Sequence, residues 1–143
     1  MYHEYAWPMP TPSEAHLLSA RLFRVIDRMR ADFAAIAADF DLTPLQARSL
    51  LFLEEARPMR VLADHLGSEP SNVTGLADRL QEAGLVQRVA GTDRRVKVLQ
   101  LTPEGRRLRE RLAEQAASRS TVTARLDAEE RRTLADLLDR LLE

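Results

Sequence analysis

The middle of the chain contains two helix-forming segments that meet at a glycine and are followed directly by two strand-forming segments. Pro58 begins a short helix, Gly67 ends it, and Pro70 begins a second helix after a tight turn. Residues 85–90 and 96–101 are rich in β-branched side chains and flank a polar, charged turn, so they predict a β-hairpin. A helix, a tight turn, a second helix and a hairpin in this order predict a winged helix-turn-helix.

Further helices are predicted on both sides of this motif. Thr11 and Thr43 each precede a proline and, three residues on, a Glu or Gln, which is the pattern of a capping box at a helix start. Thr102 and Asp127 begin the two helices predicted after the hairpin. Residues 2–10 hold two tyrosines, a tryptophan and two prolines, and they are predicted to form an extended arm.

The first helix has more apolar surface than one small domain can cover. Its apolar residues recur at steps of three and four, and Leu17 and Phe23 lie off that stripe. The last helix has its own stripe of leucines, so we expect both helices to pack against a second copy of the chain. The predicted fold is mainly α with a small β-hairpin wing. Residues 41–102 are predicted to form the winged helix-turn-helix domain, and residues 1–40 and 103–143 a helical dimerisation region.

The net charge of −1 hides an uneven distribution of charge along the chain. Residues 85–111 hold eight basic and three acidic side chains, a local charge of +5, whereas both ends of the chain are acidic. A basic middle indicates a polyanionic partner such as double-stranded DNA. Of the 21 basic residues only Lys97 is a lysine. This excess of arginine suits bidentate contacts with phosphate and guanine, but a GC-rich genome also produces it, and we give the genomic explanation more weight.

The helix that begins at Pro70 has a polar outward face near its N-terminus. Its apolar residues recur at helical spacing and predict a face turned toward the core. Small hydroxyl and amide side chains, with a glycine that lets the backbone approach, suit a helix that enters the major groove, and its N-terminus favours phosphate. The candidate DNA-binding residues on this outward face are Ser71, Asn72, Thr74, Gly75 and Arg79.

The turn of the hairpin carries the strongest local charge signal. Arg94 and Arg95 lie at its tip, where a narrow minor groove would attract them. Asp93 cannot favour DNA directly, so we expect it to pair with Arg95 or Arg79 and to fix the direction of that arginine. For Arg79, contact with DNA and an internal pair with Asp93 are equally consistent with the sequence.

Basic residues outside this helix and the turn are weaker candidates. Arg57 and Arg60 flank the start of the short helix. Most arginines in such a position face water, but contact with a DNA phosphate is also consistent with the sequence, so both are candidate DNA contacts. The four arginines between residues 106 and 111 form a charge run on a predicted helix, and most such runs face water.

The run from Leu62 to Gly105 resembles the multiple-antibiotic-resistance-regulator (MarR) family. The matching parts are an "LA..L" helix, a "G-L-V-x-R" exit into the first strand, and a "D-R-R … L-T-x-x-G" wing and exit. The resemblance implies an obligate dimer with intertwined terminal helices. It places the minor-groove arginine of the wing at Arg95, its orienting acid at Asp93 and the major-groove helix at residues 70–83.

The resemblance also implies a function. The chain is expected to be a bacterial transcriptional repressor that binds a palindromic operator as a homodimer. Members of the family often have a pocket between the dimer helices and the DNA-binding lobe, so we expect a small aromatic or phenolic effector to release the DNA. Family members that sense oxidation through cysteine have no counterpart here, because the chain has no cysteine.

Other classes of function find no support in the sequence. His3, His16 and His65 are scattered without a second ligand at metal spacing, so no metal and no cofactor is predicted. No catalytic motif is present, which argues against a nucleic-acid-modifying enzyme. A winged helix that binds protein instead of DNA would have a neutral or acidic wing. No secretory signal and no membrane span is predicted, so a cytoplasmic protein is expected.

Overall fold

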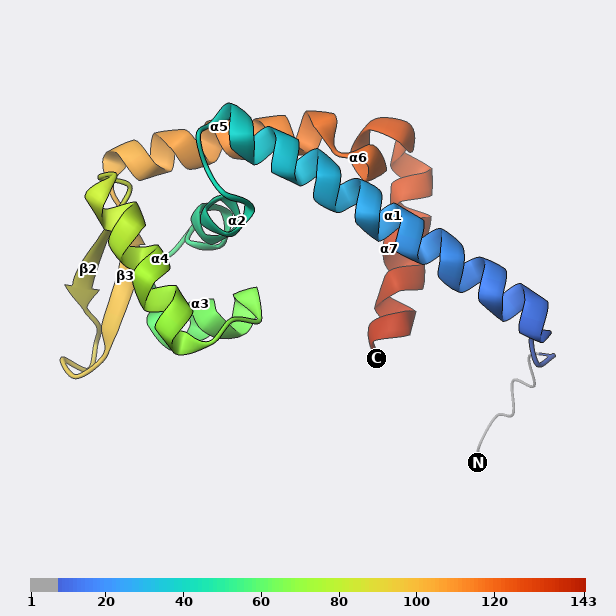
Figure 1. The fold of residues 1–143 in the computed structure, drawn as a ribbon, viewed down its shortest axis with the longest axis horizontal. Coiled ribbons are helices and arrows are strands. Elements are labelled where there is room, and N and C mark those ends of the chain that lie inside the picture. The colour runs from blue at the N-terminus through green and yellow to red at the C-terminus, as the bar shows by residue number, and fades with distance from the viewer. Residues whose placement is uncertain (1–7) are drawn as a thin grey trace.

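The computed structural model describes residues 8–143 and has a helical framework with one small sheet (Figure 1). Most of the predicted N-terminal arm, including Trp7 and His3, lies outside the described residues. In chain order the elements are α1 (Pro12–Asp39), α2 (Pro44–Phe52), β1 (Arg57–Pro58), α3 (Met59–Leu66), α4 (Pro70–Glu82), β2 (Val86–Ala90), β3 (Lys97–Leu101), α5 (Pro103–Arg119), α6 (Thr121–Arg125) and α7 (Ala128–Leu142). The predicted fold class, mainly α with a β wing, is confirmed.

Side-chain caps start four of these helices at the predicted residues. Thr43 and Asp127 form complete capping boxes, in which the cap side chain accepts from the backbone three residues on and that residue's side chain accepts from the cap N–H. Thr11 and Thr102 accept only the first of these two bonds. Each bond satisfies a backbone N–H that has no partner inside the helix.

The turn between α3 and α4 is closed by Gly67. Its φ of 60° lies in the left-handed region, and the N–H of Ser68 donates to the carbonyl oxygen of Ala63 at 3.1 Å. This geometry ends α3 abruptly, and Pro70 opens α4 directly afterwards. The helix-turn-helix therefore forms where the sequence predicts it.

The sheet has three antiparallel strands in the order β1-β3-β2. Strands β2 and β3 form the predicted hairpin, with Arg88 opposite Leu99, and β1 places Arg57 on the other side of Leu99. Neither β1 nor the short helix α6 was predicted from the sequence. Both are too short to show a periodic pattern of apolar residues.

One core fills the lobe formed by α2 to α5 and the end of α1. Its largest fully buried apolar side chains are Ile36, Leu50, Leu53, Leu62, Val73, Leu80, Val86, Leu99 and Leu112. The N-terminal half of α1 extends away from this lobe (Figure 1). Its apolar residues are exposed, as are those of α7: Leu17, Leu18, Leu22, Phe23, Val25, Ile26, Leu137, Leu138, Leu141 and Leu142. No helix in residues 8–143 is long and apolar enough to cross a membrane.

Candidate nucleic-acid interface

Helix α4 has the predicted inward and outward faces. Val73, Ala77 and Leu80 are buried in the core of the lobe. The five candidate residues Ser71, Asn72, Thr74, Gly75 and Arg79 are all exposed. A polar surface is therefore presented along the N-terminal part of α4.

This polar surface has two edges that face different neighbours. Asn72, Gly75 and Arg79 lie on the edge that faces the start of α2, across a groove of about 570 Å³. Thr74 lies on the other edge, which faces the wing, and its hydroxyl donates to the carbonyl oxygen of Pro70 at 3.2 Å. An additional Cβ at Gly75 would meet no atom within 4 Å, so the surface beside it is open.

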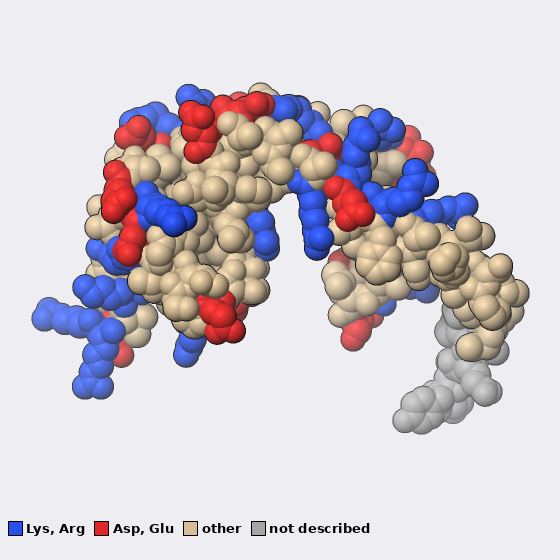
Figure 2. Space-filling model, in the orientation of Figure 1, with Lys and Arg blue, Asp and Glu red and all other residues tan. Residues whose placement is uncertain are grey.

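The tip of the wing is exposed and basic. Arg94 and Arg95 lie in the turn between β2 and β3 and form no ion pair among residues 8–143. In Figure 2, Lys and Arg side chains project from the end of the lobe where Figure 1 places this turn. The backbone N–H of Val96 donates to the carbonyl oxygen of Asp93 at 2.9 Å and closes the turn.

Asp93 orders this turn in a different way from the one predicted. Its Oδ1 accepts a hydrogen bond from the backbone N–H of Arg95 at 3.0 Å, and it forms no ion pair with a guanidinium of the described chain. The predicted pair with the Arg79 side chain is absent, because Arg79 lines the groove beside α2 instead of reaching the wing. Asp93 thus fixes the backbone that carries Arg95, and the side chains of Arg94 and Arg95 form no ion pair with the described chain.

Arg88 is an interface residue that the sequence reasoning missed. Its guanidinium donates to Asp78 Oδ1 at 2.5 Å and to Gln81 Oε1 at 2.6 Å, and it lies 3.5 Å from the Thr74 carbonyl oxygen. It therefore joins β2 of the wing to α4. The signal in the sequence was the arginine that ends the G-L-V-x-R motif, which is Arg88, although the sequence does not show its partners on α4.

The two weaker basic candidates have different surroundings. Arg60 is exposed on α3. Arg57 lies in β1, where its guanidinium is 3.4 Å from Glu55 and 5.8 Å from the centre of the Phe52 ring. The structure therefore does not place Arg57 beside α4 and the wing tip. Its side chain lines a cavity instead.

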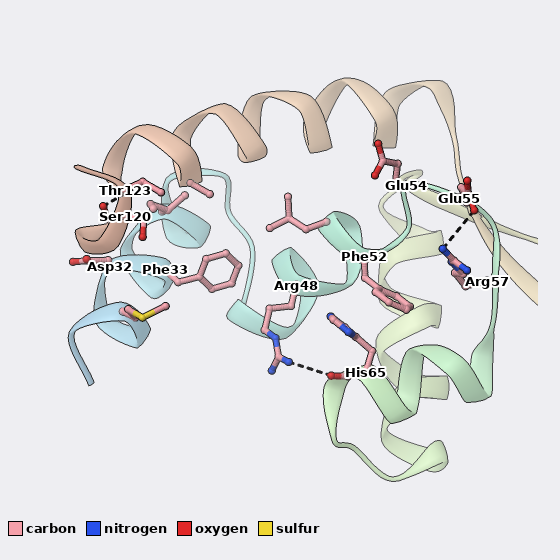
Figure 3. Close-up of a pocket in the computed structure, with 14 residues that line it drawn as sticks. Asp32, Phe33, Arg48, Phe52, Glu54, Glu55, Arg57, His65, Ser120 and Thr123 are labelled. Atoms are coloured by element: carbon pink, nitrogen blue, oxygen red, sulfur yellow. Dashed lines mark hydrogen bonds and ion pairs between the residues drawn. The ribbon is translucent and has the colours of Figure 1, made fainter. Parts of the chain in front are cut away.

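This cavity, of about 780 Å³, lies between α1, α2, α3 and the junction of α5 with α6 (Figure 3). Its apolar lining is Met29, Phe33, Ile36, Leu51, Phe52 and Ala116, and its charged or titratable lining is Asp32, Arg48, Glu54, Glu55, Arg57 and His65. Asp32 lies at one end and Arg57 at the other (Figure 3). The cavity combines aromatic surface with two arginines and three carboxylates, and Glu54 and Glu55 lie at the same end as Arg57 (Figure 3).

Two contacts organise the walls of the cavity. The rings of Phe52 and His65 stack with centroids 3.9 Å apart, and Arg48 donates to the His65 carbonyl oxygen at 3.3 Å. The Nε of Arg57 is buried without a hydrogen-bond partner.

Asp32 closes the opposite end by joining α1 to α6. Its carboxylate accepts hydrogen bonds from both the hydroxyl and the backbone N–H of Thr121 and lies 3.5 Å from Arg28. The hydrogen bond from the Thr121 hydroxyl is the main cause that lowers the pKa of Asp32, because it favours the ionised form. No group of metal-binding side chains occurs within residues 8–143.

A polar α4, a preceding α3 joined by a tight turn, and a basic hairpin define a winged helix-turn-helix protein. A model of the MarR family matches residues 40–96. The curated HTH-type transcriptional regulator FarR of Neisseria gonorrhoeae is 30% identical over 137 residues, which are 93% of this chain and 94% of FarR. The chain belongs to the MarR family of transcriptional regulators.

Solved structures agree with this family assignment. The transcriptional repressor CouR, bound to a 23-mer DNA duplex, is 29% identical with a TM-score of 0.76, over 96% of this chain and 100% of that one. A mutant MarR from Escherichia coli in complex with operator DNA has a TM-score of 0.72 over 94% and 100% of the two chains. At 22% identity, that second likeness shows the shared fold.

Proposed function

We propose that this protein is a transcriptional repressor that binds a palindromic operator as a homodimer and leaves the DNA when a small aromatic effector binds. The observation that carries the proposal is the pair of exposed elements on one lobe: the polar surface of α4 and the unpaired arginines of the wing tip. CouR, which has the same fold, is described as a repressor bound to DNA, and this description supports the same role here.

In this proposal α4 reads the major groove. Ser71, Asn72 and Thr74 contact base edges, and each good pair contributes about 1–3 kcal/mol of discrimination between bases. Gly75 allows the helix backbone to approach the DNA because it has no side chain, and no protein atom within 4 Å of the position of a Cβ blocks that approach. Arg79, which has no ion-pair partner in residues 8–143, is free to contact a phosphate or a base.

The wing supplies contacts that depend less on the DNA sequence than those of α4 do. Arg94 and Arg95 enter the flanking minor groove, whose negative potential attracts them, while Asp93 holds the turn in shape. Arg60, exposed on the helix before the turn, contributes a phosphate contact.

The dimer follows from the apolar surfaces of α1 and α7 that the single chain leaves exposed. Residues 1–40 and 103–143 form the dimerisation region, and residues 41–102 form the DNA-binding domain. A two-fold axis between two such chains places the α4 helices about one helical turn (roughly 34 Å) apart on one face of the DNA, so the operator is palindromic.

The cavity supports an effector of aromatic and acidic character. Phe33 and Phe52 offer ring surfaces, while the guanidinium groups of Arg48 and Arg57 offer donors for a carboxylate or phenolate oxygen, which at Arg57 would compete with Glu55. Such a ligand releases DNA only to the extent that it binds more tightly to a dimer whose two DNA-binding lobes, one from each chain, are spaced so that they do not fit the operator.

The test is selection of bound sequences from random duplex DNA, followed by binding measurements on the selected site. An inverted repeat bound by two chains, and released by members of a panel of phenolic acids, is the expected result. Arg48→Gln should weaken release while leaving DNA affinity unchanged. Enrichment of no sequence above background would refute sequence-specific DNA binding, and selected sites without two-fold symmetry would refute the palindrome.

A further inference from the structure

We infer that Arg88 is a positioning residue for DNA binding, which holds the wing against α4 so that both elements meet one half-site as a rigid pair. This inference rests on the proposed function. Arg88 does not itself touch DNA in this account, because its guanidinium is occupied by acceptors of α4. Its side chain is 24% exposed, whereas that of Asp78 is 56% exposed.

The contacts of Arg88 extend along one edge of α4. Its three acceptors belong to Thr74, Asp78 and Gln81, which are spaced by four and three residues and therefore lie on one side of the helix. The bonds to Gln81 and Asp78 use different nitrogens of the guanidinium, and the bond to Asp78 is also an ion pair. A planar fork fixed at two points restricts rotation in a way that a single contact does not.

The wing needs this restraint because β2 is the edge strand of the sheet. Strand β1 supports β3 only at Val98 and Leu99, and β2 has no strand on its outer side. Beyond Arg88 the hairpin continues to the turn at Arg94, on the order of 15 Å further, so a rotation of about 10° moves the turn by about 3 Å. That displacement is as long as a hydrogen bond and would remove the wing tip from a groove that α4 has already fixed.

Arg88 also neutralises Asp78, whose carboxylate lies on the exposed side of α4. An unpaired carboxylate there would repel the DNA phosphates. Two variants separate the positioning role from this charge effect. The double variant Asp78→Asn with Arg88→Gln removes both charges, and Arg88→Lys keeps the positive charge but loses the planar guanidinium that donates at two points.

The experiment measures how much affinity for the selected operator, expressed per half-site, is lost by Arg95→Ala in each background. In the wild type the loss should be about tenfold, the effect of one charge-assisted contact. In the doubly neutral background and in Arg88→Lys the loss should fall to about threefold or less, because an unlocked wing seldom occupies the groove. A role in stability alone would change the fraction of folded protein, which is titrated separately, but not this ratio.

Arg107→Gln is the matched control, since Arg107 is exposed on α5 and in no ion pair among residues 8–143. It should leave the tenfold loss unchanged. An equal loss from Arg95→Ala in all backgrounds would overturn the inference while leaving the proposed function intact. If the doubly neutral protein does not fold, Arg88→Lys alone decides the question. Absence of operator binding by the wild type would instead refute the proposed function.

Discussion

Two glycine-to-alanine substitutions should have opposite effects on stability, although both glycines lie in helices next to the candidate interface. Gly105 is buried in the first turn of α5, where the base of the hairpin crosses it. A Cβ at Gly105 would lie 2.9 Å from the backbone carbon of Leu85 and closer still to its carbonyl oxygen. Backbone cannot move aside as a flexible side chain can, so α5 or the hairpin must shift.

The magnitude follows from two opposing contributions. Overpacking against a fixed neighbour costs about 1–3 kcal/mol, whereas alanine gains up to about 1 kcal/mol over glycine in helix propensity. Because the close atoms are backbone, the cost lies near the upper end of its range, and Gly105→Ala should lower the free energy of unfolding by about 2 kcal/mol. Gly75→Ala meets no atom within 4 Å, so it keeps only the gain and should raise the free energy of unfolding by up to about 1 kcal/mol.

Urea unfolding at one fixed protein concentration measures both effects, because the stability of a dimer depends on concentration. Gly105→Ala should also weaken operator binding, since Thr102 ties the start of α5 to the base of the hairpin through its bond to the Gly84 carbonyl oxygen at 2.6 Å. A Gly105→Ala protein as stable as the wild type would refute the close approach between α5 and Leu85.

Four other substitutions test the dimer interface, the DNA contacts and the link between α1 and α6. Leu22→Glu should convert the proposed dimer to a monomer in light scattering, with helix content retained in circular dichroism. A variant that stays dimeric would remove α1 from the proposed interface. Arg95→Ala should lower the slope of log affinity against log salt by about one unit per lost contact, whereas Asn72→Ala should change base preference more than non-specific affinity; equal losses on all sequences would make Asn72 a backbone contact. Asp32 has a lowered pKa in the folded protein, so its contribution to stability is present above its ordinary pKa of 3.8 and is lost as the pH falls through the folded value. Asp32→Asn should therefore flatten the acid side of the stability profile below about pH 4, and an unchanged acid transition would contradict the link to Thr121.

The elements that could be predicted from the sequence are those whose limits depend on neighbouring residues. Thr43 and Asp127 begin helices through bonds to residues three positions on, and Gly67 ends α3 through its own φ angle. Such signals act within a few residues and can be read from the sequence directly. The inward face of α4 was predicted for the same reason, because helical spacing alone sets it.

The features that could not be predicted depend on residues brought together by the fold. The partner of Asp93 was expected to be a guanidinium, yet its carboxylate accepts from the backbone N–H two residues on, a contact that aspartates in short turns often make. Arg88 and Asp78 lie on different elements, so their pairing depends on how β2 crosses α4. The cavity has the same origin, since it is lined by residues from Met29 to Thr123 that share no sequence pattern.

The register of the sheet connects these unpredicted features to one another. Leu99, buried in the central strand, is opposite Arg57 of β1 on one side and opposite Arg88 of β2 on the other. Arg57 lines the cavity, and Arg88 holds the wing to α4. A ligand that repositions Arg57 therefore acts on the strand whose opposite edge carries Arg88. The proposed effector could thus change the position of the wing relative to α4 without entering the DNA interface, provided that it binds the two positions with different affinities.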